Sequence, residues 1–158
     1  ITSKRNSTLI EPVIKEITVL ATPQRAFQVF TAELANWWPL DSHSLSAMAG
    51  NRAKDVIMQP GVGGKIIEHM HDGNTANWGV ITDWDSGKKL GFTWHLRNRP
   101  SEQTHVTVDF TENGDHTSVR LTHQGWDGQG SQGGANRAQY QSGWDQVFVT
   151  CYAASFAT

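Results

Sequence analysis

The stretch "VTVDFTENGDHTSVRLTHQGW", residues 106–126, holds two runs of alternating residues around an Asn-Gly pair. One face of each run is apolar apart from a single histidine: Val106, Val108 and Phe110 in the first run, and Val119, Leu121 and His123 in the second. An Asn-Gly pair supplies the positive φ angles that a tight hairpin turn demands. The stretch therefore predicts an antiparallel hairpin with one covered face.

The segments before this hairpin also read as strands. From residue 56 onward, strand-like runs are joined by the turn signals "QPGVGG", "HDGN", "DSGKK" and "RNRPSEQ". Two further faces are expected to be covered: Trp78, Val80 and Trp84 in one strand, and Leu90, Phe92 and Trp94 in the next. Residues 12–21 alternate in the same way, so they predict a first strand. About six strands are expected between residues 56 and 124.

Helices are expected after the first strand and at the C-terminal end. Thr22 can cap a helix that begins at Pro23, and Pro39 disfavours helical geometry at Trp38, where the pattern stops. After the glycine-rich stretch "WDGQGSQGG", an apolar stripe at helical spacing predicts a final helix that covers the sheet. The members of that stripe are Tyr140, Trp144, Val147, Phe148, Cys151, Tyr152 and Phe156.

Together these elements predict an α+β fold. It consists of a curved antiparallel sheet of six or seven strands wrapped around a long C-terminal helix, with one or two short helices after the first strand. We expect residues 1–11 to be a partly disordered N-terminal extension and residues 12–158 to form a single domain. A twisted sheet does not follow a straight helix along its whole length, so a ligand cavity is expected between them.

Composition narrows the classes of function. The chain has 158 residues, a net charge of −2 and scattered basic residues, so we expect no nucleic-acid partner. It has one cysteine, which excludes an internal disulfide and favours a cytoplasmic location. No apolar run has the roughly 18 residues needed for membrane insertion. Seven tryptophans are unusual for this length, and they indicate a large aromatic core or pocket.

Several motifs resemble one known superfamily. "ATPQRAFQVFT", "NWWP", "QPGVGGKIIE", "DGNTANWGVITDWDSGKKLGFTW", the opening hairpin and "YQSGWDQV" occur in the order typical of the START-like superfamily, also called SRPBCC or helix-grip. Within it the sequence resembles the group named after the activator of the ninety-kilodalton heat-shock-protein ATPase. The resemblance implies a hydrophobic cavity under the C-terminal helix, and the group's name implies a role in the stress response. Members of the superfamily include lipid carriers, hormone receptors, polyketide cyclases and a co-chaperone domain, so the fold alone does not select a function.

Glu68 and His123 are the candidate catalytic residues. Glu68 shares a strand face with Ile66 and Met70, where a carboxyl group is costly unless it is paired or lies in a cavity. His123 faces inward with Val119 and Leu121. Across a cavity the two would form the one acid–base pair that this sequence offers, and whether they come within hydrogen-bond reach stays open from the sequence. In the structural alternative, Glu68 accepts a hydrogen bond from Tyr140 or an indole, and His123 is a satisfied core residue.

His69 and His71 raise the possibility of a metal site, but two solvated histidines on the outer face of an edge hairpin are the favoured interpretation. Both are expected on the outer face of their strand, and no third ligand lies nearby in the sequence. We therefore expect no metal and no cofactor.

The first hypothesis for function is the binding of a small hydrophobic or aromatic molecule. The predicted ligand-binding residues are Trp38, Glu68, Trp78, Trp94, His123, Tyr140 and Trp144. The alternatives are a cyclase- or hydrolase-like enzyme that uses Glu68 and His123, and a cofactor of the heat-shock chaperone ATPase. Whether the protein is an enzyme, forms a homodimer or has a chaperone partner stays open from the sequence.

Overall fold

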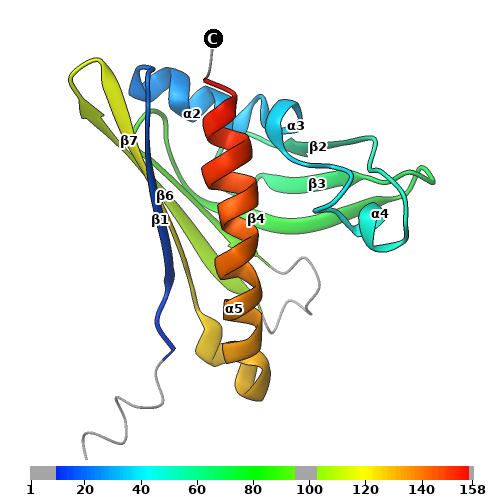
Figure 1. The fold of residues 1–158 in the computed structure, drawn as a ribbon. Coiled ribbons are helices and arrows are strands. Elements are labelled where there is room, and N and C mark those ends of the chain that lie inside the picture. The colour runs from blue at the N-terminus through cyan, green and yellow to red at the C-terminus, as the bar shows by residue number, and fades with distance from the viewer. Residues whose placement is uncertain (1–9, 95–102, 157–158) are drawn as a thin grey trace, which may run out of the picture.

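The computed structural model describes residues 10–94 and 103–156 (Figure 1). Most of the predicted extension and most of the "RNRPSEQ" turn lie outside these residues. Seven strands form one antiparallel sheet in the order β1-β7-β6-β5-β4-β3-β2. They are β1 (Val13–Val19), β2 (Asp55–Met58), β3 (Lys65–His69), β4 (Thr75–Asp85), β5 (Lys89–Trp94), β6 (Thr104–Asn113) and β7 (His116–Gln124).

Helical segments occupy one side of this sheet (Figure 1). Between β1 and β2 lie α2 (Pro23–Thr31), α3 (Leu34–Trp37) and α4 (Leu45–Met48). After β7 come the 3₁₀ segment η2 (Trp126–Gln132), α5 (Gly133–Trp144) and the π-helical segment η3 (Asp145–Tyr152). The predicted fold class is confirmed, with one short helix more after the first strand than the sequence indicated.

The hairpin of β6 and β7 forms as predicted, with a small change in its turn. Val106 pairs with His123 and Phe110 with Val119, and all four side chains are buried. Asn113 pairs with His116, so the two-residue loop is Gly114–Asp115. In that loop Gly114 has a positive φ of 68°. The turn is therefore displaced by one residue from the predicted Asn-Gly centre.

Strand β4 departs from simple alternation at two β-bulges. Its register against β3 skips Trp78, and its register against β5 skips Thr82. Each extra residue bends the strand and reverses which face the following side chains occupy. Trp78, Ile81 and Trp84 therefore pack against the core. Val80 pairs with the exposed Lys65 on the other face, so the prediction that it shares their face is wrong.

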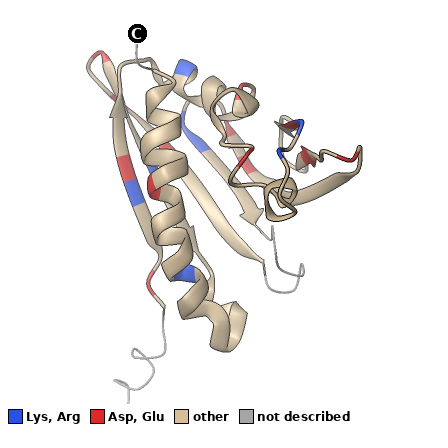
Figure 2. Cartoon of the chain, turned by 45° about the vertical axis from the view of Figure 1, so that its right-hand side comes forward, with Lys and Arg blue, Asp and Glu red and all other residues tan. Residues whose placement is uncertain are grey.

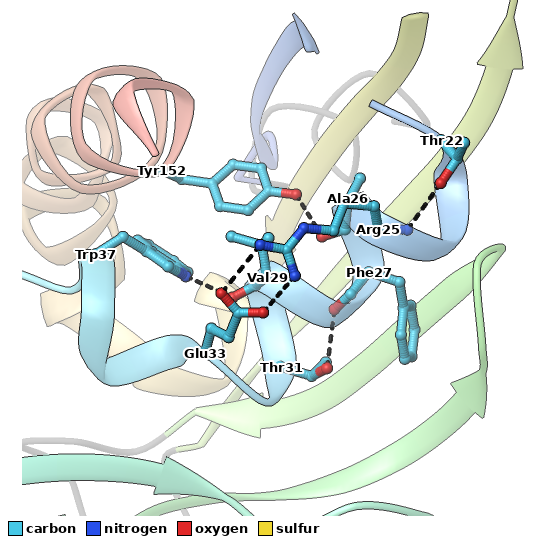
Figure 3. A network of polar contacts seen from close by, with 9 residues as sticks. All are labelled: Thr22, Arg25, Ala26, Phe27, Val29, Thr31, Glu33, Trp37 and Tyr152. Atoms are coloured by element: carbon cyan, nitrogen blue, oxygen red, sulfur yellow. Dashed lines mark hydrogen bonds and ion pairs between the residues drawn. The ribbon is translucent and has the colours of Figure 1, made fainter. Parts of the chain in front are cut away.

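The final helix and α3 are each fastened to α2 by a hydrogen bond to a main-chain carbonyl (Figure 3). The Tyr152 hydroxyl donates to the carbonyl oxygen of Ala26 at 2.7 Å, and Trp37 Nε1 donates to that of Val29 at 2.8 Å. Burial raises the pKa of Tyr152 far above its ordinary value, so the phenol stays protonated and able to donate. The predicted apolar stripe packs against the core, as expected.

Charged residues are dispersed over the described chain, and the final helix carries few of them (Figure 2). Arg137 of α5 donates from Nε to the carbonyl oxygen of Glu11 at 2.6 Å. Asp145 of η3 forms an ion pair with Lys15 of β1 at 2.8 Å. Both charged residues connect the helix to β1 or to the residues just before it. They lie away from the helix face that packs on the centre of the sheet.

Gly79 in β4 gives a direct test of this packing. A Cβ atom at Gly79 would lie 1.8 Å from the carbonyl oxygen of Thr93. We expect Gly79→Ala to lower the free energy of unfolding by about 2 kcal/mol or more, since the main chains of β4 and β5 have to separate. A Cβ atom at Gly128 meets nothing within 4 Å, so Gly128→Ala is the matched control. Urea denaturation compares the two, and equal stabilities would contradict the β4–β5 geometry.

Candidate functional site

A cavity of about 330 Å³ lies between the final helix and the segment that follows α3. The helix contributes residues spaced by three and four positions, so they form one face. They are Asn136, Gln139, Tyr140, Gly143, Trp144 and Val147. The opposite wall and the floor are formed by Trp38, Ser42, His43, Ser44, Met48 and Trp94.

Indole rings form the floor of this cavity. The ring centroids of Trp38, Trp94 and Trp144 lie 5.9 to 6.1 Å from one another. Trp78 lies behind them, with its ring centroid 5.2 Å from that of Trp38 and 5.6 Å from that of Trp94. We call Trp38, Trp78, Trp94 and Trp144 the tryptophan cluster. These side chains fill the deep part of the space between sheet and helix and leave an open cavity above them.

Each indole N–H of the tryptophan cluster donates to an acceptor of the protein. Trp38 Nε1 donates to the carbonyl oxygen of His43 at 2.7 Å, and Trp94 Nε1 donates to the Tyr140 hydroxyl at 3.0 Å. The other two indoles, Trp78 and Trp144, donate to Glu68 and His123, which are described next. Fixed N–H groups hold the rings in one orientation, so the floor is rigid before any ligand arrives.

Glu68 is fully buried and anchors helix α4. Its Oε1 accepts from the N–H of Leu45 at 2.8 Å and from Trp78 Nε1 at 3.1 Å. Its Oε2 accepts from the N–H of Ser46 at 2.9 Å. The Ser44 hydroxyl caps the same helix by accepting from the N–H of Ala47. Glu68 therefore accepts a hydrogen bond from an indole, which is one of the two partners considered in the structural alternative.

His123 is also fully buried, and its protonation state follows from its neighbours. Trp144 Nε1 can only donate, so His123 Nδ1, 3.0 Å away, is the acceptor. The ring proton is then on Nε2, which donates to Thr104 Oγ1 at 2.6 Å, and that hydroxyl donates to the carbonyl oxygen of Trp94. Burial, with a smaller contribution from His105, lowers the pKa of His123 to about 3. The imidazole is therefore neutral at neutral pH.

The structure does not bring Glu68 and His123 together as an acid–base pair. The first lies on β3 and the second on β7, and each bonds to a different indole of the tryptophan cluster. Neither residue lines the cavity, and neither does Trp78. Of the predicted ligand-binding residues, Trp38, Trp94, Tyr140 and Trp144 do line it. The hydrogen bonds of Glu68 and of His123 therefore go to separate partners.

His69 and His71 differ from the expected pair of solvated histidines. His69 Nδ1 is hydrogen-bonded to Asp55 Oδ1 on the neighbouring strand. His71 lies beyond the end of β3, and its Nδ1 is hydrogen-bonded to Ser46 Oγ of α4 at 3.1 Å, as is its main-chain N–H at 3.0 Å. The two imidazoles therefore bond to different elements.

Sequence reasoning missed the polar side chains of the cavity. Ser42 and His43 belong to "NWWPLDSHS", in which the sequence indicates only the end of a helical pattern. Asn136 and Gln139 flank the apolar stripe of the final helix and belong to no motif identified from the sequence. A helical projection that includes polar residues places them beside Tyr140 and Trp144.

The titration of His123 predicts a loss of stability in acid. The imidazole titrates near 6.5 in the unfolded chain and near 3 in the folded protein, so between these values only the unfolded state gains the proton. The stabilisation is complete above pH 6.5 and is lost as the pH falls towards 3, by up to about 1.4 kcal/mol per pH unit. Urea denaturation at pH values from 7 to 5 gives the free energy of unfolding at each pH. This free energy should fall less steeply with decreasing pH for His123→Gln than for the unmodified protein. Identical slopes would contradict the neutral, buried imidazole.

Comparisons with known proteins agree with the fold. The family described as "Activator of Hsp90 ATPase homolog 1-like protein" matches residues 20–150. Comparison with curated protein sequences gave no match. Among residues 10–94 and 103–156, no helix has the length and apolarity needed to cross a membrane.

Three solved structures illustrate the likeness. An anthrahydroquino-γ-pyrone synthase, Txn09, complexed with SUM, is 30% identical, with 85% of this chain and 86% of that chain covered and a TM-score of 0.57. The Aha1 dimer from Colwellia psychrerythraea is 17% identical, with 94% and 98% covered and a TM-score of 0.67. DynU16, from the dynemicin biosynthetic locus, is 14% identical, with 94% of this chain but 48% of that chain covered and a TM-score of 0.64.

The family match spans most of the sequence, and the sheet with its long C-terminal helix is the helix-grip architecture of the superfamily. The chain therefore belongs to the Activator of Hsp90 ATPase homolog 1-like family of START-like proteins.

Proposed function

We propose that this protein binds a neutral, flat aromatic molecule of the polyketide type in the cavity above the tryptophan cluster. The observation that carries the proposal is a rigid floor of indole faces at the base of a cavity of about 330 Å³. Small-molecule sites commonly begin near 300 Å³ and combine apolar walls with a few polar groups. Stacked aromatic pairs add about 0.5–1.5 kcal/mol each beyond the burial of area.

The polar groups of the cavity favour a ligand without charge. Among the described residues that line it, none is aspartate, glutamate, lysine or arginine. The side chains of Ser42, Asn136 and Gln139 instead offer hydroxyl and amide groups, which suit the carbonyl and hydroxyl oxygens of a polyketide. A carboxylate or phosphate would lose its hydration in such a site without gaining a counter-charge.

The comparisons support this ligand class. The synthase that is 30% identical to the chain is named for an anthrahydroquinone-type product. A second neighbour comes from the dynemicin biosynthetic locus. Ligand binding and cyclase-like roles are both consistent with these relatives.

Gly143 provides the test of the binding site. It lines the cavity in the middle of the helix face, and a Cβ atom there would meet nothing within 4 Å. We expect Gly143→Leu to fill the cavity and to weaken the binding of 1,8-dihydroxyanthraquinone by about tenfold or more, which corresponds to about 1.4 kcal/mol. Calorimetric titration and quenching of tryptophan fluorescence both report this affinity.

Gly134 supplies the matched control for that experiment. It lies in the same helix, also has open space around its Cβ position, and does not line the cavity. Gly134→Leu should therefore bind the anthraquinone as the unmodified protein does. Equal affinities for the two leucine variants would refute this location of the site.

The family description favours a second candidate, a cofactor of the ninety-kilodalton chaperone ATPase. This function would act through the surface and would not need the cavity. It predicts that the purified protein changes the ATPase rate of the chaperone and that Gly143→Leu leaves that change intact. If the rate is unaltered by the protein, this candidate is excluded for the chaperone tested.

A further inference from the structure

Met48 is the most exposed apolar residue among the described residues of the cavity lining. It is 56% exposed, whereas the three indoles of the lining are between 2% and 7% exposed and Val147 is 2% exposed. Tyr140 is half-buried. A ligand gains hydrophobic free energy only from apolar area that water contacts before binding. Met48 therefore carries area that a ligand in the cavity could cover, and the indoles carry much less.

The main chain that carries Met48 is fixed. The N–H of Met48 donates to the carbonyl oxygen of Ser44 at 3.2 Å, so the residue closes the turn of α4. The N–H of Ser46 donates to Glu68 at 2.9 Å, and the Ser46 hydroxyl is hydrogen-bonded to His71 Nδ1 at 3.1 Å. The sheet thus holds α4 in place, while the unbranched side chain of Met48 keeps several rotatable bonds.

The two kinds of wall differ in what they offer a ligand. The indoles of the tryptophan cluster are held by hydrogen bonds, so the floor has one shape. A methionine side chain adapts its shape to a neighbour, and its polarizable sulfur makes favourable contacts with aromatic rings. A rigid floor beside one adaptable thioether suits a flat ring system that has to be covered after it has entered.

We infer that Met48 folds over the bound aromatic molecule and packs its thioether against the ring system from the side of α4. The inference rests on the proposed function, because it concerns the same cavity. Binding then buries the exposed area of Met48, and the ring system lies between α4 and the final helix. Met48 is a ligand-binding residue of this site that the sequence did not single out.

Truncation of Met48 measures the contribution of this contact to affinity. We expect Met48→Ala to weaken the binding of 1,8-dihydroxyanthraquinone about fivefold or more, because the ligand then covers less apolar area. Met48→Leu keeps the apolar volume and should stay within about threefold of the unmodified protein. Calorimetric titration gives the three dissociation constants.

Val62 supplies the matched control for the loss of exposed apolar surface. It is 70% exposed, lies between β2 and β3, and is not part of the cavity lining. Val62→Ala should bind the anthraquinone as the unmodified protein does. Because Met48 is exposed, Met48→Ala should also keep the urea midpoint of the unmodified protein, so that a loss of affinity is not a loss of fold.

Methionine methyl resonances report the contact directly. The chain has three methionines, and among the described residues of the cavity lining Met48 is the methionine present. In protein labelled with ¹³C at the methionine methyl groups, Met48→Leu identifies the Met48 resonance by removing it. Addition of 1,8-dihydroxyanthraquinone should shift this resonance through the ring current of the ligand. The resonances of Met58 and Met70 should move much less.

Each result supports or overturns a stated claim. If Met48→Ala binds the anthraquinone as tightly as the unmodified protein, or if the Met48 methyl resonance stays in place when the ligand is bound, the inference is overturned. In either case the proposed function stands as long as Gly143→Leu weakens binding. If the unmodified protein does not bind the anthraquinone, the proposed function and the inference fail together.

Discussion

A buried indole N–H needs an acceptor, and the centre of this protein is arranged around four such groups. Trp78 and Trp144 are the deepest donors, and their acceptors are the carboxylate of Glu68 and the imidazole of His123. An unsatisfied buried donor costs about 1–3 kcal/mol, so each acceptor is a condition for packing its ring. The polar residues of the core thus serve the aromatic ones, and the floor of the cavity is the result.

This requirement also explains the separation between buried and cavity-facing polar groups. Glu68 is saturated by protein donors, and both ring nitrogens of His123 are bonded to protein groups, so the two residues contribute rigidity instead of reactivity. His43, Asn136 and Gln139 lie where the tryptophan cluster ends and the open space begins. A ligand on this floor therefore meets indole faces below and neutral polar groups at the rim.

The sequence predicted those parts of the fold in which pattern and packing agree. Alternation placed Val106, Phe110 and Val119 correctly, and helical spacing identified the stripe of the final helix. It failed at Val80, because a bulge inserts a residue without any local signal. It also missed α4, a helix of four residues that depends on a carboxylate 22 to 23 positions away in the sequence. The unusual number of tryptophans pointed to the aromatic residues of the cavity. Ser42 and His43 carry no such signal, so only the three-dimensional structure shows that they line it.

Helix α4 has a consequence for how the protein reaches its native state. A helix of four residues is far too short to persist alone in water, because nucleation costs more than so few hydrogen bonds return. Two of its first N–H groups bond to Glu68, which reaches its position only when β3 has joined the sheet. The wall that carries His43 is therefore expected to assemble late, after the strands have paired. The recognition surface and the completed fold would then appear in the same step, and any ligand bound there draws the folding equilibrium towards the native protein.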